Sequence, residues 1–596
     1  MIVPSLMSSL MPTLNRWIHR LTTRFCLWLA AGLSLALLWG CVGSSVPTID
    51  SPETAEQVLF DTLLPKVSLQ ENFIDDGAAS RYATDSISEP LPNLEDFPLY
   101  GATPSGNTNQ VYIEILSSSE KANIDKQNER WLIEVADAFN RQGKTVASGQ
   151  TIQVGIRQIP SGTAARLLAA GTIQPTGYSP SNDLWVEMLR SEGVNPTPVV
   201  ERLVPNVAGF VLQKAAYDQL GSTVTFDQVV DAMISGQLTA GYPNPYTSST
   251  SLNLLYHLFW RAAGHQADGQ PLTQGDLESP EVNSVFAAFQ EQVLITTTTT
   301  LDLQEIFIRD PDKLQAFPLE YQNYQSLIQL PGFEEVQFVP FGIPHNNPLV
   351  GFDWNSPEAA DALAQFGAFA STSEIQDLAR QQGFEPTDYL QRTDLPPIPT
   401  GEVLTAAQSY WKARKDGDRT VYLMAVVDTS GSMDGEPMAA VKEGLKIASS
   451  TINAGNQVGL ITFADNTVYR VPLAPFDQLQ HQRFLAAIDT LRADGATAMY
   501  DATVVGLAEL MKRRQSDPEG RFYLLLLTDG IANRGYGFRD VKNLMTYSDI
   551  RIYPIAYGDV NEAELAEIAQ LRESTVKTGT PGNVQDLLKG IFQTNL

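Results

Sequence analysis

The feature that most constrains the fold is an alternation of apolar strand-like segments and helix-like segments after Arg419. Strands are predicted at residues 420–427, 457–464, 521–528 and 551–557, with helices at 437–452, 480–491, 499–513, 538–547, 562–571 and 584–592. Residues 422–427 and 523–527 are apolar at nearly every position, which is typical of strands buried on both faces. We therefore expect an α/β fold in which helices cover both sides of a doubly wound, mainly parallel sheet.

Polar side chains cluster in three loops at one edge of this predicted sheet. The segment Asp428-Thr-Ser-Gly-Ser432 directly follows the first strand, Thr497 precedes a helix, and Asp529 ends a later strand. Ligands of open α/β sheets bind outside the carboxyl ends of the strands. Asp428, Ser430, Ser432, Thr497 and Asp529 together offer the oxygen ligands that a magnesium-type ion prefers.

These motifs resemble a von Willebrand factor type A domain with an intact metal-ion-dependent adhesion site. The resemblance covers residues 419–596 and implies that the five side chains hold Mg²⁺, or Mn²⁺ or Ca²⁺, and that the metal binds an acidic side chain of a protein partner. Taken singly, each cluster could instead be a helix cap or a turn. Asp501, one helical turn after Thr497, could steady the site or simply favour the start of its helix.

A second α/β body is expected at residues 103–390. Strands at 111–116 and 151–158 alternate with helices at 128–142 and 164–170, and Ser-rich motifs follow the strands. The region resembles a two-lobed, type II periplasmic solute-binding protein. The resemblance places eight side chains at the cleft between the lobes, where they would bind a small polar solute: Ser118, Ser119, Ser161, Ser179, Ser181, Ser248, Ser249 and Tyr321. The alternatives are ordinary helix capping, or a fold retained as a protein-interaction scaffold.

The N-terminal residues predict export. A positive stretch containing Arg16, Arg20 and Arg24 precedes an apolar stretch at 25–39, so residues 1–40 are expected to be a signal peptide. Leu-Trp-Gly-Cys41 resembles a bacterial lipobox, which implies acylation of Cys41 and a lipoprotein of the cell envelope, in the periplasm or at the cell surface. An uncleaved anchor is the alternative. Residues 41–102 are expected to form a flexible tether with one short helix near 55–63, and residues 391–418 a linker and connecting helix.

Composition excludes several functions. With 40 Lys and Arg against 68 Asp and Glu, the net charge of −28 disfavours nucleic acid as a partner. Two cysteines and five scattered histidines argue against a disulfide framework or a His/Cys metal centre. No Gly-x-Ser-x-Gly elbow or phosphate-binding loop occurs, so we expect no enzyme. The sequence predicts a membrane-tethered binding protein that acts through metal-dependent protein interaction or, alternatively, through solute binding for transport or sensing.

Overall fold

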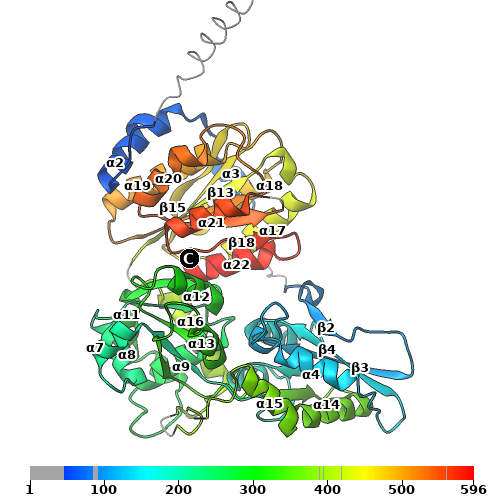
Figure 1. Cartoon of the computed structure of the whole chain (residues 1–596). Coiled ribbons are helices and arrows are strands. Elements are labelled where there is room, and N and C mark those ends of the chain that lie inside the picture. The colour runs from blue at the N-terminus through cyan, green and yellow to red at the C-terminus, as the bar shows by residue number, and fades with distance from the viewer. Residues whose placement is uncertain (1–45, 85–90, 388, 393–394, 418, 559) are drawn as a thin grey trace, which may run out of the picture.

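The computed structural model describes residues 46–84, 91–387, 389–392, 395–417, 419–558 and 560–596 (Figure 1). The predicted signal peptide and Cys41 lie outside these residues. Within the described parts of the chain, no helix is long and apolar enough to cross a membrane. The described residues form three β-sheets: one in the C-terminal body and one in each of two lobes formed by the middle of the chain. The prediction of two α/β bodies is confirmed.

The C-terminal body is built on a seven-stranded sheet in the order β1-β15-β14-β13-β16-β17-β18. Every neighbouring pair is parallel except β14 and β15. The strands are β1 (Leu69–Glu71), β13 (Val421–Asp428), β14 (Gln457–Phe463), β15 (Thr467–Pro475), β16 (Arg521–Thr528), β17 (Arg551–Tyr557) and β18 (Lys577–Gly579). The mainly parallel sheet matches the prediction, whereas β1, β15 and β18 are not among the strands predicted from the sequence.

Helices cover both faces of this sheet (Figure 1). They are α17 (Glu436–Ser449), α18 (Gln478–Asp489), α19 (Met499–Ser516), α20 (Phe538–Tyr547), α21 (Glu562–Leu571) and α22 (Val584–Asn595). Alternate residues of β13 point to opposite faces. Met424 and Val426 therefore share a core with α19, α20 and α21, whereas Leu423 and Val427 share the other core with α17, α18 and α22.

Residues 46–84 do not form the flexible tether predicted for residues 41–102. The helix expected near residues 55–63 is present as α2 (Pro52–Val58) and the π-helix η1 (Leu59–Leu63), which bury Leu59 and Leu63 completely in the core of the C-terminal body. Strand β1 then pairs with β15, and the short helix α3 (Asp76–Ala79) packs on α18. The prolines and carboxylates of this segment suggest a linker, but its few apolar residues bury surface against a body that starts about 350 residues later.

The first lobe of the middle body contains a six-stranded sheet in the order β2-β4-β3-β5-β12-β6. Its strands are β2 (Leu99–Gly101), β3 (Gln110–Ser117), β4 (Thr151–Gln158), β5 (Gly177–Ser179), β6 (Pro196–Val200) and β12 (Leu349–Phe352). Its helices are α4 (Trp131–Asn140), α5 (Ser161–Ala169), α6 (Leu184–Ser191), α14 (Pro357–Ala370) and α15 (Ser373–Gln381). Strand β2 comes from the predicted tether, so that expectation also fails at its C-terminal end.

The second lobe contains a five-stranded sheet in the order β11-β7-β10-β8-β9. Its strands are β7 (Ala208–Leu212), β8 (Ala240–Pro243), β9 (Val293–Thr297), β10 (Ala316–Glu320) and β11 (Gln337–Pro340). Its helices are α7 (Lys214–Leu220), α8 (Phe226–Ile234), α9 (Ser249–Ala262), α10 (Gln274–Leu277), α11 (Pro280–Glu291), α12 (Thr300–Arg309) and α13 (Tyr321–Leu327). The chain crosses between the lobes after β6 and again after β11, and Asn206 and His345 pair where the two crossings meet.

Helix α16 (Gly401–Arg414), expected as a connecting helix, belongs to the core of the middle body. Trp411 is fully buried there, and its indole Nε1 donates to the Tyr242 hydroxyl at 2.7 Å. Near the end of α16, Lys412 Nζ donates to the carbonyl of Gln593 in the C-terminal body at 3.0 Å. The helix therefore packs on the middle body with most of its length and contacts the C-terminal body near its end.

Candidate functional site

The first candidate site lies at the carboxyl edge of the C-terminal sheet, where β13 and β16 end side by side. Asp428 is the last residue of β13 and is completely buried. Its Oδ1 accepts from the Ser430 backbone N–H and its Oδ2 from the Thr528 hydroxyl, both at 2.7 Å. These bonds fix the carboxylate against the adjacent strand end.

The other predicted ligands converge on Asp428 from the neighbouring loops. Ser430 and Ser432 place their Oγ atoms 3.2 Å apart, and Ser432 Oγ donates to Asp529 Oδ1 at 2.7 Å. A Cβ atom on Gly530 would stand 3.5 Å from Thr497 Oγ1 and 3.9 Å from Ser432 Oγ. The structure thus brings all five predicted side chains to one edge, beside a glycine whose missing side chain leaves the space open.

The electrostatics of this edge favour a bound cation. Burial raises the pKa of Asp428, and the negative charge of the nearby Asp529 raises it further. Hydrogen bonds from Ser430 and Thr528 lower this pKa but do not cancel the increase. Burial also raises the pKa of Asp529. Neither carboxylate forms an ion pair with a basic side chain in the described part of the chain. A cation would therefore offset the negative charge of these two carboxylates, which no basic side chain of the described residues neutralises.

The donor set fits a hard divalent cation. It combines two carboxylates with three hydroxyls, and Ser432 is exposed while Asp428, Ser430 and Thr497 are buried. No group of three or more His, Cys, Asp or Glu side chains able to hold a metal occurs in the described residues, so a metal here would depend on the hydroxyl oxygens. Oxygen ligands and an open side are typical of magnesium sites that retain a position for an outside ligand.

Asp501, left open between two roles by the sequence, holds a loop. Its Oδ1 accepts from the backbone N–H of Tyr536 at 2.8 Å, in the loop that follows β16. In the same loop, Asn533 Oδ1 accepts from the Thr497 N–H at 2.9 Å. Asp501 therefore helps to position a loop that contacts Thr497.

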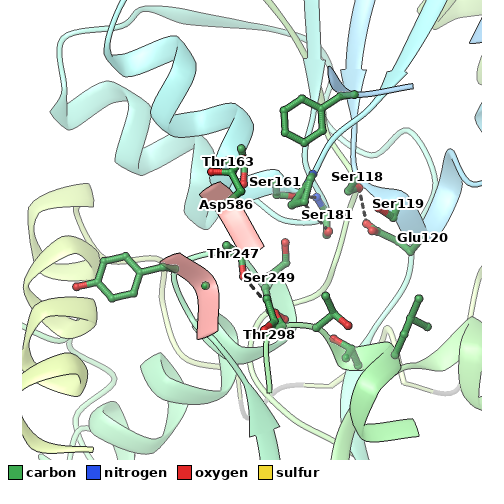
Figure 2. Close-up of a pocket in the computed structure, with 18 of the residues that line it drawn as sticks. Ser118, Ser119, Glu120, Ser161, Thr163, Ser181, Thr247, Ser249, Thr298 and Asp586 are labelled. Atoms are coloured by element: carbon green, nitrogen blue, oxygen red, sulfur yellow. Dashed lines mark hydrogen bonds between the residues drawn. The ribbon is translucent and has the colours of Figure 1, made fainter. Parts of the chain in front are cut away.

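The second candidate site is a cavity of about 360 Å³ between the two lobes of the middle body (Figure 2). Six of the eight serine and tyrosine residues predicted for this cleft line it: Ser118, Ser119, Ser161, Ser181, Ser248 and Ser249. Two predicted residues do not. Ser179 is buried behind the wall, where its hydroxyl bonds the Asn347 carbonyl. Tyr321 packs among Tyr324, Phe338 and Tyr389, because it starts α13 on the side of the aromatic core.

A buried ion pair lies beside the cavity. Glu120 lines the cavity, whereas its partner Lys121 is completely buried outside the lining. Lys121 Nζ is 3.7 Å from Glu120 and donates to Ser118 Oγ, the Ser179 carbonyl and Asn347 Oδ1 at 2.5–2.9 Å. Burial lowers the pKa of Lys121 to about 8. Burial alone would raise the pKa of Glu120, but Lys121 and hydrogen bonds with Ser118 and Ser181 hold it below its ordinary value. This polar network fixes Glu120 in the cavity wall.

The C-terminal body provides a third wall of the same cavity. Residues at the start and along one side of α22 line it: Gly582, Asn583, Asp586, Leu587, Lys589, Gly590 and Gln593. Figure 2 shows Asp586 on this helix together with the labelled serines and threonines of the two lobes. The contact is close, since a Cβ on Gly590 would lie 3.2 Å from Thr298 Cγ2 of the second lobe. The cavity is therefore bounded by both lobes and by α22.

Sequence reasoning missed two kinds of cavity residue. Glu320 ends strand β10 and Asn323 lies in the first turn of α13, so the strand-end rule used for Asp428 points to this place, although it does not choose between Glu320 and Tyr321. The residues of α22 carry no sequence signal for the cavity, since they belong to a different body.

Known proteins are similar to parts of this chain. Residues 423–589 match the family model of the von Willebrand factor type A domain. An uncharacterized protein of Synechocystis sp. is 27% identical over 176 residues, which cover 29% of this chain and 40% of that protein. The chain thus spans less than half of that relative's length.

Solved structures are similar to separate parts of the chain. A von Willebrand factor type A structure from Catenulispora acidiphila is 22% identical over 29% of this chain and 42% of its own, with a TM-score of 0.26. Iron-bound HitA from Pseudomonas aeruginosa is 15% identical over 50% of this chain and 97% of its own (TM-score 0.36). The sulfate-binding protein SubI from Mycobacterium tuberculosis is 18% identical over 47% and 88% (TM-score 0.33). With the sheet order and the strand-end cluster described above, the family match identifies residues 423–589 as a von Willebrand factor type A domain.

Proposed function

We propose that this protein is a non-enzymatic binding protein whose C-terminal domain captures a partner protein through a divalent cation. Asp428, Ser430, Ser432, Thr497 and Asp529 would hold the cation. The observation that carries the proposal is the convergence of these oxygens around two carboxylates that no basic side chain of the described residues neutralises. When bound, a Mg²⁺-type ion would supply positive charge at the exposed side of the site, where a carboxylate of the partner could bind.

The protein's own residues prepare this edge. The Ser430 N–H and the Thr528 hydroxyl fix the Asp428 carboxylate before any ligand arrives. Ser432 and Asp529 lie at the accessible rim, so an outside carboxylate could reach the site without opening the fold. The predicted attachment of the chain to a membrane through acylated Cys41, in the bacterial cell envelope, is a separate proposal that Cys41→Ser and detergent phase partitioning would test.

Calorimetry with Mg²⁺ tests the metal site. The wild type should bind Mg²⁺, and Asp428→Ala should abolish binding because it removes the only completely buried carboxylate of the set. Asp434→Ala is the matched control, since Asp434 is an exposed acid in the same loop and should leave binding intact. Binding of an aspartate-containing peptide should then require Mg²⁺ and disappear with EDTA. Peptide binding that persists in EDTA would contradict the proposed function.

A second candidate function is solute binding in the cavity between the lobes. It is favoured by the cavity itself, whose volume lies near the lower end of the range for small-molecule pockets and whose lining residue Ser118 is held in place by Lys121. Thermal-shift screening with small solutes tests it. Ser119→Ala should reduce the shift produced by any true ligand, whereas Ser105→Ala, at an exposed position of the first lobe, should not.

A further inference from the structure

We propose that the interlobe cavity binds a small solute that carries an ammonium group, held by Glu320 and Asn323. This inference rests on the second candidate function, that the cavity binds a small solute, and adds the chemical class of that solute. It depends on which hydrogen-bonding positions the protein leaves unfilled in the cavity, and on how its charged groups are already paired.

Two residues that line the cavity each carry a buried acceptor without a partner. Glu320 Oε2 and Asn323 Oδ1 form no hydrogen bond within the described residues, although only 6% and 7% of these residues are exposed. Their other atoms are engaged. Glu320 Oε1 accepts from Thr250 Oγ1 at 2.9 Å, and Asn323 Nδ2 donates to Glu129 Oε1 at 2.9 Å. A buried acceptor without a donor is costly, so both positions call for a ligand that donates.

The basic side chains near Glu320 are already used. Lys121 has three N–H donors, and all three bond Ser118, Ser179 and Asn347. Arg166 faces Asp586 on α22, where their opposite charges interact. The lining contains five acidic side chains (Asp96, Glu120, Glu129, Glu320 and Asp586) and two basic ones (Arg166 and Lys589). Lys121 and Lys126 pair with Glu120 and Glu129, so the acids still outnumber these bases by five to four, which favours a cationic group over an anion.

His345 is directed at the other oxygen of Glu320. Its Nδ1 lies 2.6 Å from Glu320 Oε1, while its Nε2 faces the amide nitrogens of Asn182 and Asn253 at 3.0 and 3.1 Å. The backbone fixes these amides with their N–H groups toward the ring, because Asn253 Oδ1 accepts from the Ile343 N–H and Asn182 Oδ1 from the Leu184 N–H. Nε2 therefore accepts, and Glu320 Oε2 receives no hydrogen bond from the ring.

An ammonium group fits better than a metal ion. Both unfilled positions need a hydrogen-bond donor, which an N–H group supplies directly. In contrast, no three His, Cys, Asp or Glu side chains of the described residues come together closely enough to hold a metal. The uncapped N-terminus of α5 also faces the cavity, beginning at Ser161. A carboxylate at the far end of the solute could lie there, so an amino acid belongs among the probes.

Thermal-shift and calorimetric measurements on the full chain test the inference with methylammonium, 1,4-diaminobutane and glycine. The controls are 1,4-butanediol, which has the carbon chain of the diamine without its charges, and sulfate. At least one amine should raise the melting temperature, whereas the diol and sulfate should not. Because a charge-assisted hydrogen bond is lost, Glu320→Gln should weaken the binding of that amine by about 10- to 100-fold. Glu305→Gln, at an exposed position of α12, should leave the affinity for the amine unchanged.

The possible results distinguish a failure of the ammonium assignment from a failure of the proposed solute binding. Amine binding that is lost in Glu320→Gln and kept in Glu305→Gln supports the inference. Binding of sulfate or the diol but not of any amine, reduced by Ser119→Ala, would overturn the ammonium assignment and leave solute binding in place. The absence of any ligand for the cavity would overturn both. The wild-type comparison of amine and diol decides the question even if Glu320→Gln does not fold.

Discussion

The polar site of the von Willebrand factor type A domain lies within one body, whereas the interlobe cavity is assembled from the two lobes of the middle body and from helix α22 of the C-terminal body. Asp428 and Asp529 sit at or just after the ends of two adjacent strands, and the remaining ligands come from loops at the same edge. The cavity instead gathers Glu120 from the first lobe, Glu320 from the second and Asp586 from α22. A site at strand ends depends on local order in one sheet, but the cavity depends on how whole bodies are packed.

This difference predicts that the two sites respond differently to the same disturbance. Changes inside the C-terminal core should first weaken cation binding at the proposed metal site (Asp428, Ser430, Ser432, Thr497 and Asp529). Changes at the contact between the bodies should weaken ligand binding in the cavity and leave cation binding unchanged. Four substitutions test this contrast, in order of decreasing expected effect.

The largest effect is expected for Leu59→Ala. Leu59 is completely buried in the core of the C-terminal body, although it lies in the segment that the sequence presents as a tether. Truncating a buried leucine costs about 2–5 kcal/mol, so urea unfolding followed by circular dichroism should show a clear loss of stability. The control is Leu69→Ala, because Leu69 is 40% exposed on the edge strand β1. Equal losses in the two variants would mean that residues 46–71 are not part of this body.

A smaller effect is expected for Gly590→Leu, which should separate the two sites. The new side chain would press on Thr298 and push α22 away from the second lobe, at a cost of about 1–3 kcal/mol. The melting-temperature shift given by an amine should disappear while the shift given by Mg²⁺ remains. Gly590→Ala should show the same change in weaker form. Loss of both shifts together would contradict the separation of the sites.

Glu573→Gln tests the ionic contact between the C-terminal body and the second lobe. Glu573 lies 2.8 Å from Lys313 Nζ and 3.5 Å from Arg551. Burial alone would raise the pKa of Glu573, but Lys313 and Arg551 lower it to about 2. A carboxylate with a depressed pKa stabilises the fold above its ordinary value of 4.5 and loses this contribution as the pH falls from 4.5 toward 2.

The wild type should therefore be more stable than Glu573→Gln at neutral pH, by about 1–2 kcal/mol for a charge-assisted bond. In thermal melts across pH, the difference should shrink as the pH falls below 4.5. Glu562→Gln, at an exposed position on α21, should match the wild type throughout. A difference that does not change with pH would mean that the charge of Glu573 is not what stabilises the contact.

The smallest effect is expected for Tyr321→Phe. Tyr321 packs among aromatic side chains and does not line the cavity, in contrast to its neighbour Glu320. The affinity for a cavity ligand should change by no more than about twofold, because Tyr321 does not line the cavity and shares no contact with a ligand there. Calorimetry with the amine that binds the wild type gives the comparison. A loss of affinity as large as that caused by Glu320→Gln would mean that Tyr321 belongs to the solute-binding site, as the sequence predicted.

The convergence of the five oxygen-bearing side chains at one sheet edge was predictable because its determinants are local. Each ligand stands at or just after a strand end, or just before a helix, and parallel strands bring such positions to one edge. The serines of the cleft were predictable for the same reason, and six of the eight proposed cleft residues line the cavity. The rule places a segment at an edge but does not orient each side chain. That is why Tyr321 was chosen over Glu320, and why Ser179 was counted although its hydroxyl points into the protein.

The sequence by itself determined the alternating α/β pattern and the oxygen-rich strand ends, since periodicity and strand-end chemistry depend on neighbours in the chain. Only the tertiary structure decided that residues 46–71 complete the C-terminal body and that α22 walls the interlobe cavity. Both contacts join segments hundreds of residues apart. Burial of apolar surface stabilises such contacts regardless of how far apart the two segments lie in the sequence. A local sequence pattern therefore does not identify the surface on which a segment will pack.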